Sequence, residues 1–350
     1  MFDQKKIAVV GYGYWGAKHA RVLSSLPGVA LTVIDADETC LAEAEKQFPA
    51  ARLVSRLDAA LDDLDGVVVA TPPGSHATLA SQALAAGMHT LVEKPLTTSV
   101  ADAESLIGIA RENNALLMVG HTFEYNAAVR KLREIVRSGD LGRILYIHSS
   151  RLGLGRYQKD CDVVWDLAPH DISIISYLLD EMPTSVSAWA DRNVGPRHAD
   201  VAYVRLDFSE ADTHAIVHVS WLDPCKVRRV TVVGDQKMAV YDDLSDNERI
   251  RVYDIGVDIA LMDDYTSSPS MPVSYRTGDI VSPYLAFEEP LKVQDSHFLD
   301  CIRGVARPES PGERGLEVVR VLKAVDSAHS VTGRVSVASP LRLVPEQVAQ

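Results

Sequence analysis

The hydrophobic pattern of the chain changes character near residue 123. Before that point, short uninterrupted apolar runs alternate with stretches in which apolar residues recur every three or four positions. Such runs are typical of parallel strands buried on both faces. A recurrence of apolar residues every three or four positions, as in the stretches between the runs, is typical of helices. The runs are KIAVVG, ALTVID, DGVVVAT, MHTLVEK and ALLMVGH, with a weaker RLVS between the second and third. The pattern predicts a doubly wound α/β domain over residues 1–122.

The second half, residues 123–350, carries longer segments in which apolar and polar side chains alternate. A period of two predicts strands with one covered face and one open face, as in an antiparallel sheet. These segments are RILYIHSSRLG, TSVSAWADRN, DVAYVRLDFS, THAIVHVSWLD, RRVTVVG and ERIRVYDIG. Helical spacing appears at NAAVRKLREIVRSG, WDLAPHDISIISYLL, PLKVQDSHFLDCIRG and GERGLEVVRVLKAVDSAHS. We therefore expect a second α/β domain with a large, mainly antiparallel open sheet, and an irregular loop at MDDYTSSPSMPVSYRTGD.

Composition narrows the class of protein. The chain has 350 residues, of which 47% are hydrophobic and 24% charged, enough for a sizeable core without disulfides. A net charge of −13 argues against a nucleic acid or an anionic membrane as partner. No stretch approaches a signal peptide or the ~20 apolar residues of a membrane span. The four cysteines stand far apart, so we predict a cytoplasmic protein with reduced thiols.

The six residues GYGYWG fit the pattern G-x-G-x-x-G and stand between a predicted strand and a predicted helix. In that context Gly11 permits a tight turn, Gly13 lets a pyrophosphate approach the backbone, and Gly16 lets the helix pack close to the strand. The N-terminal turn of the helix, with Tyr14 and Trp15, would present free N–H groups to the phosphates. A glycine-rich turn that merely folds well is the alternative interpretation.

Asp35 ends the second predicted strand, at the ~20-residue spacing where a carboxylate accepts hydrogen bonds from the ribose hydroxyls of a dinucleotide. A carboxylate at this position repels a 2′-phosphate, and no arginine follows in DADET. The sequence therefore predicts NAD as the cofactor, with NADP disfavoured. A flavin dinucleotide could use the same fingerprint and ranks lower.

Three further motifs accompany GYGYWG: ATPPGSHATLA after the fourth strand, VEKPL after the fifth, and WDLAPHD in the second half. With them the chain resembles, over nearly its whole length, the glucose–fructose oxidoreductase / inositol dehydrogenase family of NAD(P)-dependent sugar oxidoreductases. The resemblance implies a Rossmann domain followed by an α/β domain with a large open sheet. It also implies a homodimer or homotetramer built through that sheet.

The resemblance implies roles for individual residues as well. The essential lysine of the family corresponds to Lys94, which is often followed by a cis-proline, with Glu93 beside it at the cofactor. Thr71 and Pro72 would pass under the nicotinamide and its ribose. His76 would lie near the cofactor, unless it is simply the first residue of a helix.

Lys94 stands at the carboxyl end of a predicted parallel strand, where ligands bind in such sheets. A lysine there can hydrogen-bond the reacting hydroxyl and stabilise the alkoxide as it forms. Asp166 and His170 are four residues apart and share a face if the segment is helical. The histidine can then remove the hydroxyl proton, while Asp166 orients its ring or holds a neighbouring substrate hydroxyl. A buried structural histidine is the alternative, and two ligands do not make a metal site.

Substrate contacts are expected from the second half of the chain. Arg151 could point into the cleft and hold an anionic group of the substrate. Arg156, Tyr157 and Lys159, in GRYQKD, suit a phosphorylated or nucleotide-linked sugar, unless the loop is merely solvated. His214 and His218 are interpreted as packing on one sheet face, and His121 is left without a role.

Together these features predict an NAD-dependent dehydrogenase that interconverts a ring hydroxyl and a ketone of a sugar or nucleotide-sugar. Members of amino-sugar and polysaccharide pathways share motifs of this kind, which favours oxidation at C3. An inositol-type cyclitol dehydrogenase is the alternative enzyme. A non-catalytic NAD-binding regulatory protein is the alternative of another class, although it would not need Lys94, Asp166 and His170.

Overall fold

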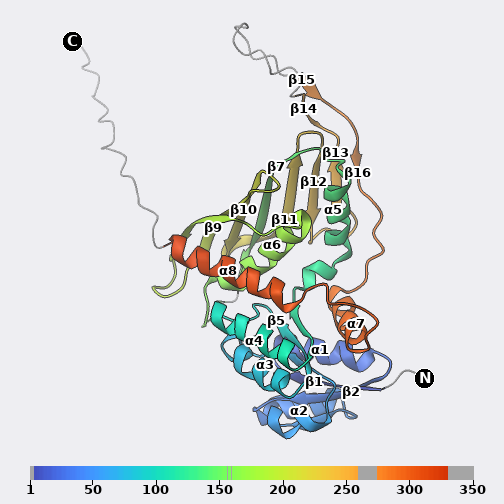
Figure 1. The fold of residues 1–350 in the computed structure, drawn as a ribbon. Coiled ribbons are helices and arrows are strands. Elements are labelled where there is room, and N and C mark those ends of the chain that lie inside the picture. Colours follow the sequence, from blue (N-terminus) through green and yellow to red (C-terminus); the bar gives the residue numbers. More distant parts are fainter. Residues whose placement is uncertain (1–3, 156, 159, 259–273, 330–350) are drawn as a thin grey trace, which may run out of the picture.

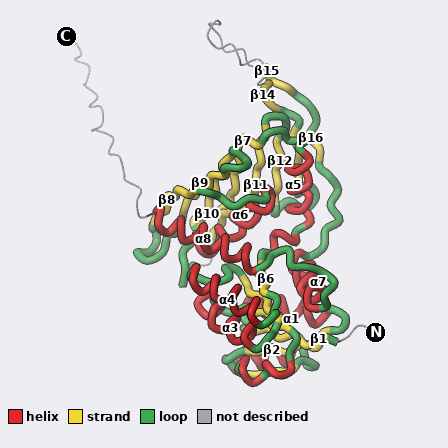
Figure 2. The backbone as a smooth tube through the Cα atoms, in the orientation of Figure 1, coloured by secondary structure: helices red, strands yellow, loops and turns green. Residues whose placement is uncertain are grey.

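The computed structural model describes residues 4–155, 157–158, 160–258 and 274–329. The chain forms two sheets, one built from the first third of the sequence and one from the second half (Figure 1). Helices cover both faces of the first sheet and one face of the second (Figure 2). The fold is therefore α/β with a parallel sheet followed by a larger mixed sheet, which confirms the predicted fold class.

The first sheet has six parallel strands in the order β3-β2-β1-β4-β5-β6. Its strands are β1 Lys5–Val10, β2 Val29–Ile34, β3 Arg52–Val54, β4 Gly66–Val69, β5 His89–Glu93 and β6 Leu117–Gly120. Strand order reverses between β1 and β4, and ligands of such sheets bind outside the strand ends at that point. The central strands β1 and β4 are buried over most of their length, as their uninterrupted apolar runs predict.

Four helices connect these strands: α1 Tyr14–Ser25, α2 Glu38–Gln47, α3 His76–Ala85 and α4 Val100–Glu112. Short 3-10 turns precede β4 and α3, at η1 Leu57–Ala59, η2 Leu61–Asp63 and η3 Pro73–Ser75. A helix from near the other end of the chain, α7 (Pro290–Ile302), also packs on this part of the protein, against α1. Its Phe298 is fully buried with Leu23 of α1 in one apolar cluster.

The second sheet has eight strands in the order β16-β13-β12-β11-β7-β10-β9-β8. Its strands are β7 Ile144–Leu154, β8 Ser185–Asp191, β9 Val201–Phe208, β10 Thr213–Ser220, β11 Leu222–Gly234, β12 Met238–Asp242, β13 Ile250–Tyr253 and β16 Ile280–Val281. β7 and β10 pair in parallel, whereas the other neighbours are antiparallel. The sheet is thus mainly antiparallel, as predicted.

The segment predicted as an irregular loop lies mostly outside the described residues. Its described part differs from the prediction, because β15 (Ser274–Arg276) pairs with β14 (Gly256–Asp258) as a separate two-stranded ribbon. Strand character there comes from pairing between distant segments, which a local Pro-rich pattern does not reveal.

The two faces of the second sheet differ. One face is covered by α5 (Ala127–Ser138), α6 (Val163–Leu179) and α8 (Gly312–His329), with the turn η4 (Thr122–Tyr125) leading into α5 (Figure 1). The other face carries half-exposed aromatic residues: Tyr146, Trp189 and Tyr203. His214 and His218 stack on Tyr146 and Tyr203, which confirms that both histidines pack on the sheet face.

α8 also contacts α4, so this helix joins the second sheet to the first (Figure 1). The helical prediction for the final segment holds as far as His329, and its remainder lies outside the described residues. Within the described part of the chain, no helix has the length and apolar character to cross a bilayer.

Candidate active site

A cleft of about 1790 Å³ lies between the carboxyl ends of the first sheet and the covered face of the second. Most residues singled out from the sequence line it: Gly11, Gly13, Tyr14, Trp15, Asp35, Thr71, Pro72, Glu93, Lys94, Arg151, Tyr157, Asp166 and His170. Gly16 and His76 are not among the lining residues. One cavity therefore connects the glycine-rich turn with the residues expected to carry chemistry.

The glycine-rich turn has the geometry of a dinucleotide cradle. Gly11 adopts a φ of +89°, which other residues rarely adopt. A Cβ at Gly16 would overlap the carbonyl oxygen of Gly11, so the close packing of α1 on the turn requires glycine there. At Gly13 a Cβ would meet nothing within 4 Å, so the missing side chain leaves open space beside the backbone. Gly13 is also the N-cap of α1 and supplies no side-chain cap to its amides.

Asp35 is fixed at the rim of the cleft just beyond β2. Its Oδ2 accepts a hydrogen bond from the Tyr12 amide at 2.6 Å, and its Oδ1 accepts one from the Asp37 amide at 2.9 Å. Arg56 also lines the cleft, but its guanidinium makes two hydrogen bonds with Asp58. Within the part of the chain that the structure describes, no arginine pairs with Asp35, as expected of a site for a 2′-hydroxyl.

Lys94 follows β5 directly, and the peptide bond to Pro95 is cis, as the resemblance implied. His76 lies behind this turn with 1% of its surface exposed. Its Nδ1 is 2.9 Å from the carbonyl oxygen of Pro95, and its Nε2 is 2.8 Å from that of Thr71. His76 therefore braces two segments that line the cleft without lining it itself, and its nearness to the cofactor stays a prediction. No local signal shows these contacts, because its two partners stand on separate strand ends.

A buried group of three charged residues supports the same turn, and no sequence motif connects these residues. His19 of α1 lies between Glu93, whose Oε1 is 3.1 Å from Nε2, and Asp295 of α7, whose Oδ1 is 2.9 Å from Nδ1. Burial alone would lower the pKa of His19, but the carboxylates of Asp295 and Glu93 raise it to about 10. His19 is therefore a cation that ties α1, β5 and α7 together directly behind Lys94.

Lys94 and Asp166 connect the two halves of the cleft. The Nζ of Lys94 donates to the main-chain oxygen of Asp166 at 2.7 Å and lies 3.5 Å from its Oδ1. The other carboxylate oxygen, Oδ2, accepts a hydrogen bond from Nε1 of Trp221 at 3.2 Å. Asp166 was expected to orient the ring of His170 or to hold a substrate hydroxyl. Its carboxylate faces Lys94, directly after β5, and Trp221, between β10 and β11.

His170 lies one turn after Asp166 on α6 and lines the same cleft. Its ring meets Phe123 edge to face, with the ring centroids 5.1 Å apart. Burial, and then the positive charges of Lys94 and Arg151, lower the pKa of His170 well below its usual value. The imidazole is therefore neutral at pH 7 and can accept a proton.

Arg151 lines the cleft but is not free to bind an anion as expected. Its Nε donates to Oδ2 of Asp171 at 2.8 Å and its Nη2 donates to Oδ1 at 3.2 Å, with both side chains buried. The ring of Phe123 lies 4.6 Å below its guanidinium. The prediction of an anion site at Arg151 is therefore corrected, because Asp171 of α6 already matches its charge.

Tyr157 lies on the rim of the cleft, where its ring packs against Trp221 with the centroids 5.1 Å apart. Arg156 and Lys159 of the same segment lie outside the described residues. Further lining residues were not anticipated from the sequence: Phe123, Trp165, Arg228 and Lys323. Trp165 begins the motif WDLAPHD but was given no role there, and the other three stand in segments whose pattern does not mark them as cleft residues.

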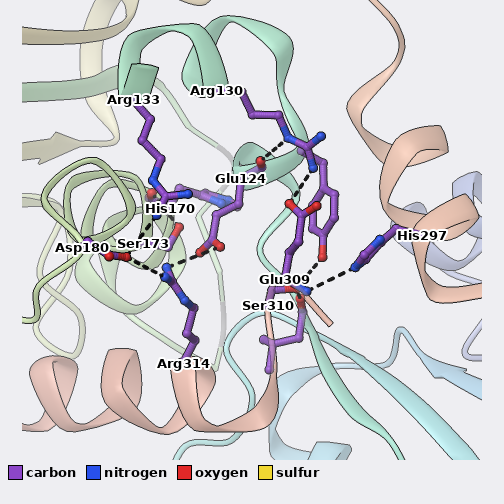
Figure 3. Close-up of polar contacts among 12 residues, drawn as sticks. Glu124, Arg130, Arg133, His170, Ser173, Asp180, His297, Glu309, Ser310 and Arg314 are labelled. Carbon is purple, nitrogen blue, oxygen red and sulfur yellow. Dashed lines mark hydrogen bonds and ion pairs between the residues drawn. The ribbon is translucent and has the colours of Figure 1, made fainter. Parts of the chain in front are cut away.

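A network of ion pairs holds the turn η4 and the helices around it (Figure 3). Arg314 of α8 lies 3.6 Å from the buried carboxylate of Glu124 and 3.7 Å from Asp180, which also binds Arg133 of α5. Arg130 donates to the main-chain oxygen of Glu124. Because η4 carries Phe123 and α6 carries His170, these contacts fix the two aromatic rings relative to each other.

Comparison with known proteins agrees with this architecture. Residues 5–121 match the model of an oxidoreductase family with an NAD-binding Rossmann fold, and residues 129–240 match the GFO/IDH/MocA C-terminal domain. The chain belongs to this GFO/IDH/MocA family of oxidoreductases, and NAD is its cofactor. It is thus a dehydrogenase-type enzyme of the class that acts on CH–OH groups.

Two relatives illustrate the range of the family. The chain is 29% identical to UDP-N-acetylglucosamine 3-dehydrogenase of Acidithiobacillus ferrooxidans over 72% of this chain and 77% of that enzyme. It is 35% identical to inositol 2-dehydrogenase of Rhodococcus erythropolis over 52% of this chain, and it spans only 54% of that enzyme's length. Among solved structures, GenD2 from gentamicin A biosynthesis, in complex with NAD, superposes with a TM-score of 0.78 at 25% identity, covering 95% of each chain.

Proposed function

We propose that the protein oxidises a ring hydroxyl of a sugar or nucleotide-sugar to a ketone, or runs the reverse reaction, with Lys94 and His170 acting on the reacting oxygen. The observation that carries the proposal is that these two residues line the same cleft as the glycine-rich turn. They come from the carboxyl end of β5 and from α6, the two elements that face each other across it. A dinucleotide cradle alone would need neither residue.

The residues of the cradle fit NAD. Gly13 leaves open space beside the start of α1, and Asp35 offers carboxylate oxygens at the rim. Thr71, Pro72 and Glu93 line the stretch between this turn and Lys94. When bound there, NAD supplies a hydride acceptor at C4 of its nicotinamide.

Each residue near the reacting end has a distinct task. His170, neutral because its pKa is low, takes the proton of the hydroxyl as the carbon is oxidised. Lys94 donates a hydrogen bond to the same oxygen and stabilises the negative charge that develops on it. Asp166 holds the ammonium of Lys94 in place and is itself held by Trp221. Tyr157 at the rim can pack against a ring of the substrate.

The substrate class follows from the relatives. A relative that is a UDP-N-acetylglucosamine 3-dehydrogenase favours an activated amino sugar oxidised at C3. The inositol 2-dehydrogenase relative supports the second candidate, a cyclitol dehydrogenase. Both reactions convert a secondary ring alcohol to a ketone, and the tasks of Lys94 and His170 are the same in each.

We further propose that residues 1–122 form the dinucleotide-binding domain and residues 123–350 the domain for substrate binding and assembly. The half-exposed aromatic residues on the open face of the second sheet support pairing of two copies through that face.

The experiment that tests the proposal is formation of NADH with a panel of nucleotide-sugars, free sugars, sugar phosphates and cyclitols. The wild-type protein is expected to reduce NAD with at least one member of the panel, and Lys94→Ala to lose about 10²–10³-fold in turnover while still binding NAD. Binding of NAD without turnover on any member would contradict the proposal and favour the regulatory alternative.

A further inference from the structure

We propose that Arg228 is the substrate-specificity residue of this cleft and that it binds a carboxylate carried by the sugar substrate. The inference rests on the proposed function and narrows its substrate class to acidic sugars, of which the uronic acids are the simplest. The sequence predicted an anion site at Arg151 on β7, and we place it at Arg228 on the neighbouring strand β11.

The position of Arg228 follows from strand register. β11 pairs antiparallel with β7, and Arg228 lies directly opposite Arg151. Opposed residues of an antiparallel pair point to the same face of a sheet, here the face covered by the helices. Arg228 and Arg151 both line the cleft. The next residue along β11, Arg229, points to the other face and binds Asp242.

The site of Arg228 is continuous with the reacting end of the cleft. Arg151 lies 4.6 Å from the centre of the Phe123 ring, and the ring of His170 meets the same phenyl group at 5.1 Å. Arg228, Arg151, Phe123 and His170 therefore form one wall. A sugar with a hydroxyl at His170 can place a carboxylate of the same molecule at Arg228.

Charge balance distinguishes Arg228 from its neighbour. The guanidinium of Arg151 forms a close bidentate pair with Asp171. Arg228 has its nearest described carboxylate in Asp243, at 3.8 Å, beyond hydrogen-bonding distance.

Asp243, which also lines the cleft, is shared between Arg228 on its Oδ2 side and other groups on its Oδ1 side. Its Oδ1 accepts a hydrogen bond from the hydroxyl of Tyr241 at 2.8 Å and lies 3.4 Å from Arg249. The ion pairs of this corner thus join the guanidinium groups of Arg151, Arg228 and Arg249 to the two carboxylates of Asp171 and Asp243. Three positive charges thus face two negative charges, which leaves an excess of one positive charge in this group. Arg228, which lines the cleft, is the arginine of the three that has no described carboxylate within hydrogen-bonding distance.

Of the other described cations that line the cleft, Arg56 pairs with Asp58 and Lys323 with Asp326. Lys18 lies over the rings of Tyr14 and Trp15, beside the glycine-rich turn. Lys94 is held by Asp166. Among the described residues of this corner, the one unmatched charge at Arg228 fits a singly charged carboxylate, which a guanidinium can bind through two parallel hydrogen bonds. A phosphate bears more charge than this corner can neutralise.

The test measures binding and turnover with three probes, D-glucuronate, D-glucose and D-glucose 6-phosphate, on the NAD-loaded protein. Calorimetry is expected to show tighter binding of glucuronate than of the other two. In Arg228→Gln the preference for glucuronate over glucose should fall about 10–100-fold, as loss of a hydrogen bond to a charged group predicts. Arg228→Lys should retain part of the preference for glucuronate, because the positive charge remains but the two parallel hydrogen bonds of the guanidinium are lost.

Arg229→Gln is the matched control, since it removes the same side chain from the next residue on the opposite face, and it should leave the preference unchanged. An equal preference in wild type and Arg228→Gln would overturn the inference, as would an equal loss in both variants. Tighter binding of glucose 6-phosphate than of glucuronate would also overturn it. Because binding is measured separately, an Arg228-dependent preference without any NADH formation would leave this inference standing and reject the proposed function.

Discussion

The ammonium of Lys94 lies 2.7 Å from the main-chain oxygen of Asp166 and 3.5 Å from its carboxylate. Lys94 directly follows β5 of the first sheet, whereas Asp166 belongs to α6, which covers the second sheet. The contact therefore sets the distance between the two walls of the cleft at the point where chemistry is expected. It also places His170, one helical turn further on, relative to the nicotinamide end of the cradle.

Trp221 should affect catalysis without touching the substrate. Its indole N–H binds Asp166, so Trp221→Phe removes the hydrogen bond while retaining most of the buried ring. We expect turnover to fall about tenfold, since one neutral-to-charged hydrogen bond that positions Lys94 is lost, while the affinity for NAD stays the same. The control is Trp189→Phe, which changes a tryptophan on the open face of the second sheet. If both variants turn over at the wild-type rate, the indole does not position Asp166.

Cofactor selectivity should depend on Asp35. The carboxylate is held at the rim by the Tyr12 amide, where it accepts hydrogen bonds from ribose and repels a 2′-phosphate. The wild-type protein should bind NAD more tightly than NADP. Asp35→Ala should reduce this difference in affinity, because NAD loses a hydrogen-bond acceptor for its ribose and NADP no longer meets a repulsive charge. Titration of both cofactors by fluorescence quenching measures this. NADP binding as tight as that of NAD in the wild type would refute the assignment.

His19 should be important for stability. Replacing it with Gln leaves the buried carboxylates of Glu93 and Asp295 without their shared cation, and breaking a buried pair of this kind costs about 3–5 kcal/mol. The control is Arg21→Gln on the same helix, which removes an exposed ion pair with Glu289 and should cost under about 1 kcal/mol. Chemical denaturation at pH 7 gives both values. Equal costs would show that the buried group is not stabilising.

The same residue makes stability depend on pH. The folded pKa of His19 is about 10, above the ordinary value of 6.5, so the folded protein binds this proton more tightly than the unfolded chain does. The contribution of His19 is therefore complete below about pH 6.5 and is lost as the pH rises toward 10. In His19→Gln the free energy of unfolding should fall less over that window than in the wild type.

The open face of the second sheet should bury its aromatic residues in an assembly. Trp189 and Tyr203 contact each other there and are 44% and 43% exposed, an arrangement that a second copy could cover. Light scattering at micromolar concentration should give the mass of a dimer or of a dimer of dimers. Trp189→Lys should shift the mass toward the monomer. A monomeric wild-type protein would rule out assembly through this face.

The cofactor end of the cleft could be predicted from sequence because its residues lie at strand ends. Carboxyl ends of parallel strands meet at one edge of a sheet, so Gly11, Asp35, Thr71 and Lys94 were expected to gather there, and all line one cleft. Helical periodicity likewise placed Asp166 and His170 on one helix. These inferences needed only local pattern and the rules of sheet topology.

The partners of these residues could not be predicted, because they are distant in sequence. His19 and Asp295 are separated by 276 positions and Lys94 and Asp166 by 72. Arg151 looked free for a substrate because nothing in its own strand reveals that Asp171 of α6 faces it. His76 was expected near the cofactor or simply as the first residue of a helix, and its contacts with two carbonyl groups from separate strand ends were not expected. Charge pairing of this kind depends on tertiary packing.

The pH dependence of turnover in His170→Ala decides whether His170 is the catalytic base. The pKa of His170 is well below the ordinary value of 6.5, so oxidation by the wild-type protein should rise with pH through an apparent pKa below that value and then stay level through pH 7. His170→Ala should lose about 10²–10⁴-fold in turnover and lose this titration, while still binding NAD. A variant with near wild-type turnover and the same pH profile would contradict the account and place the base elsewhere in the cleft.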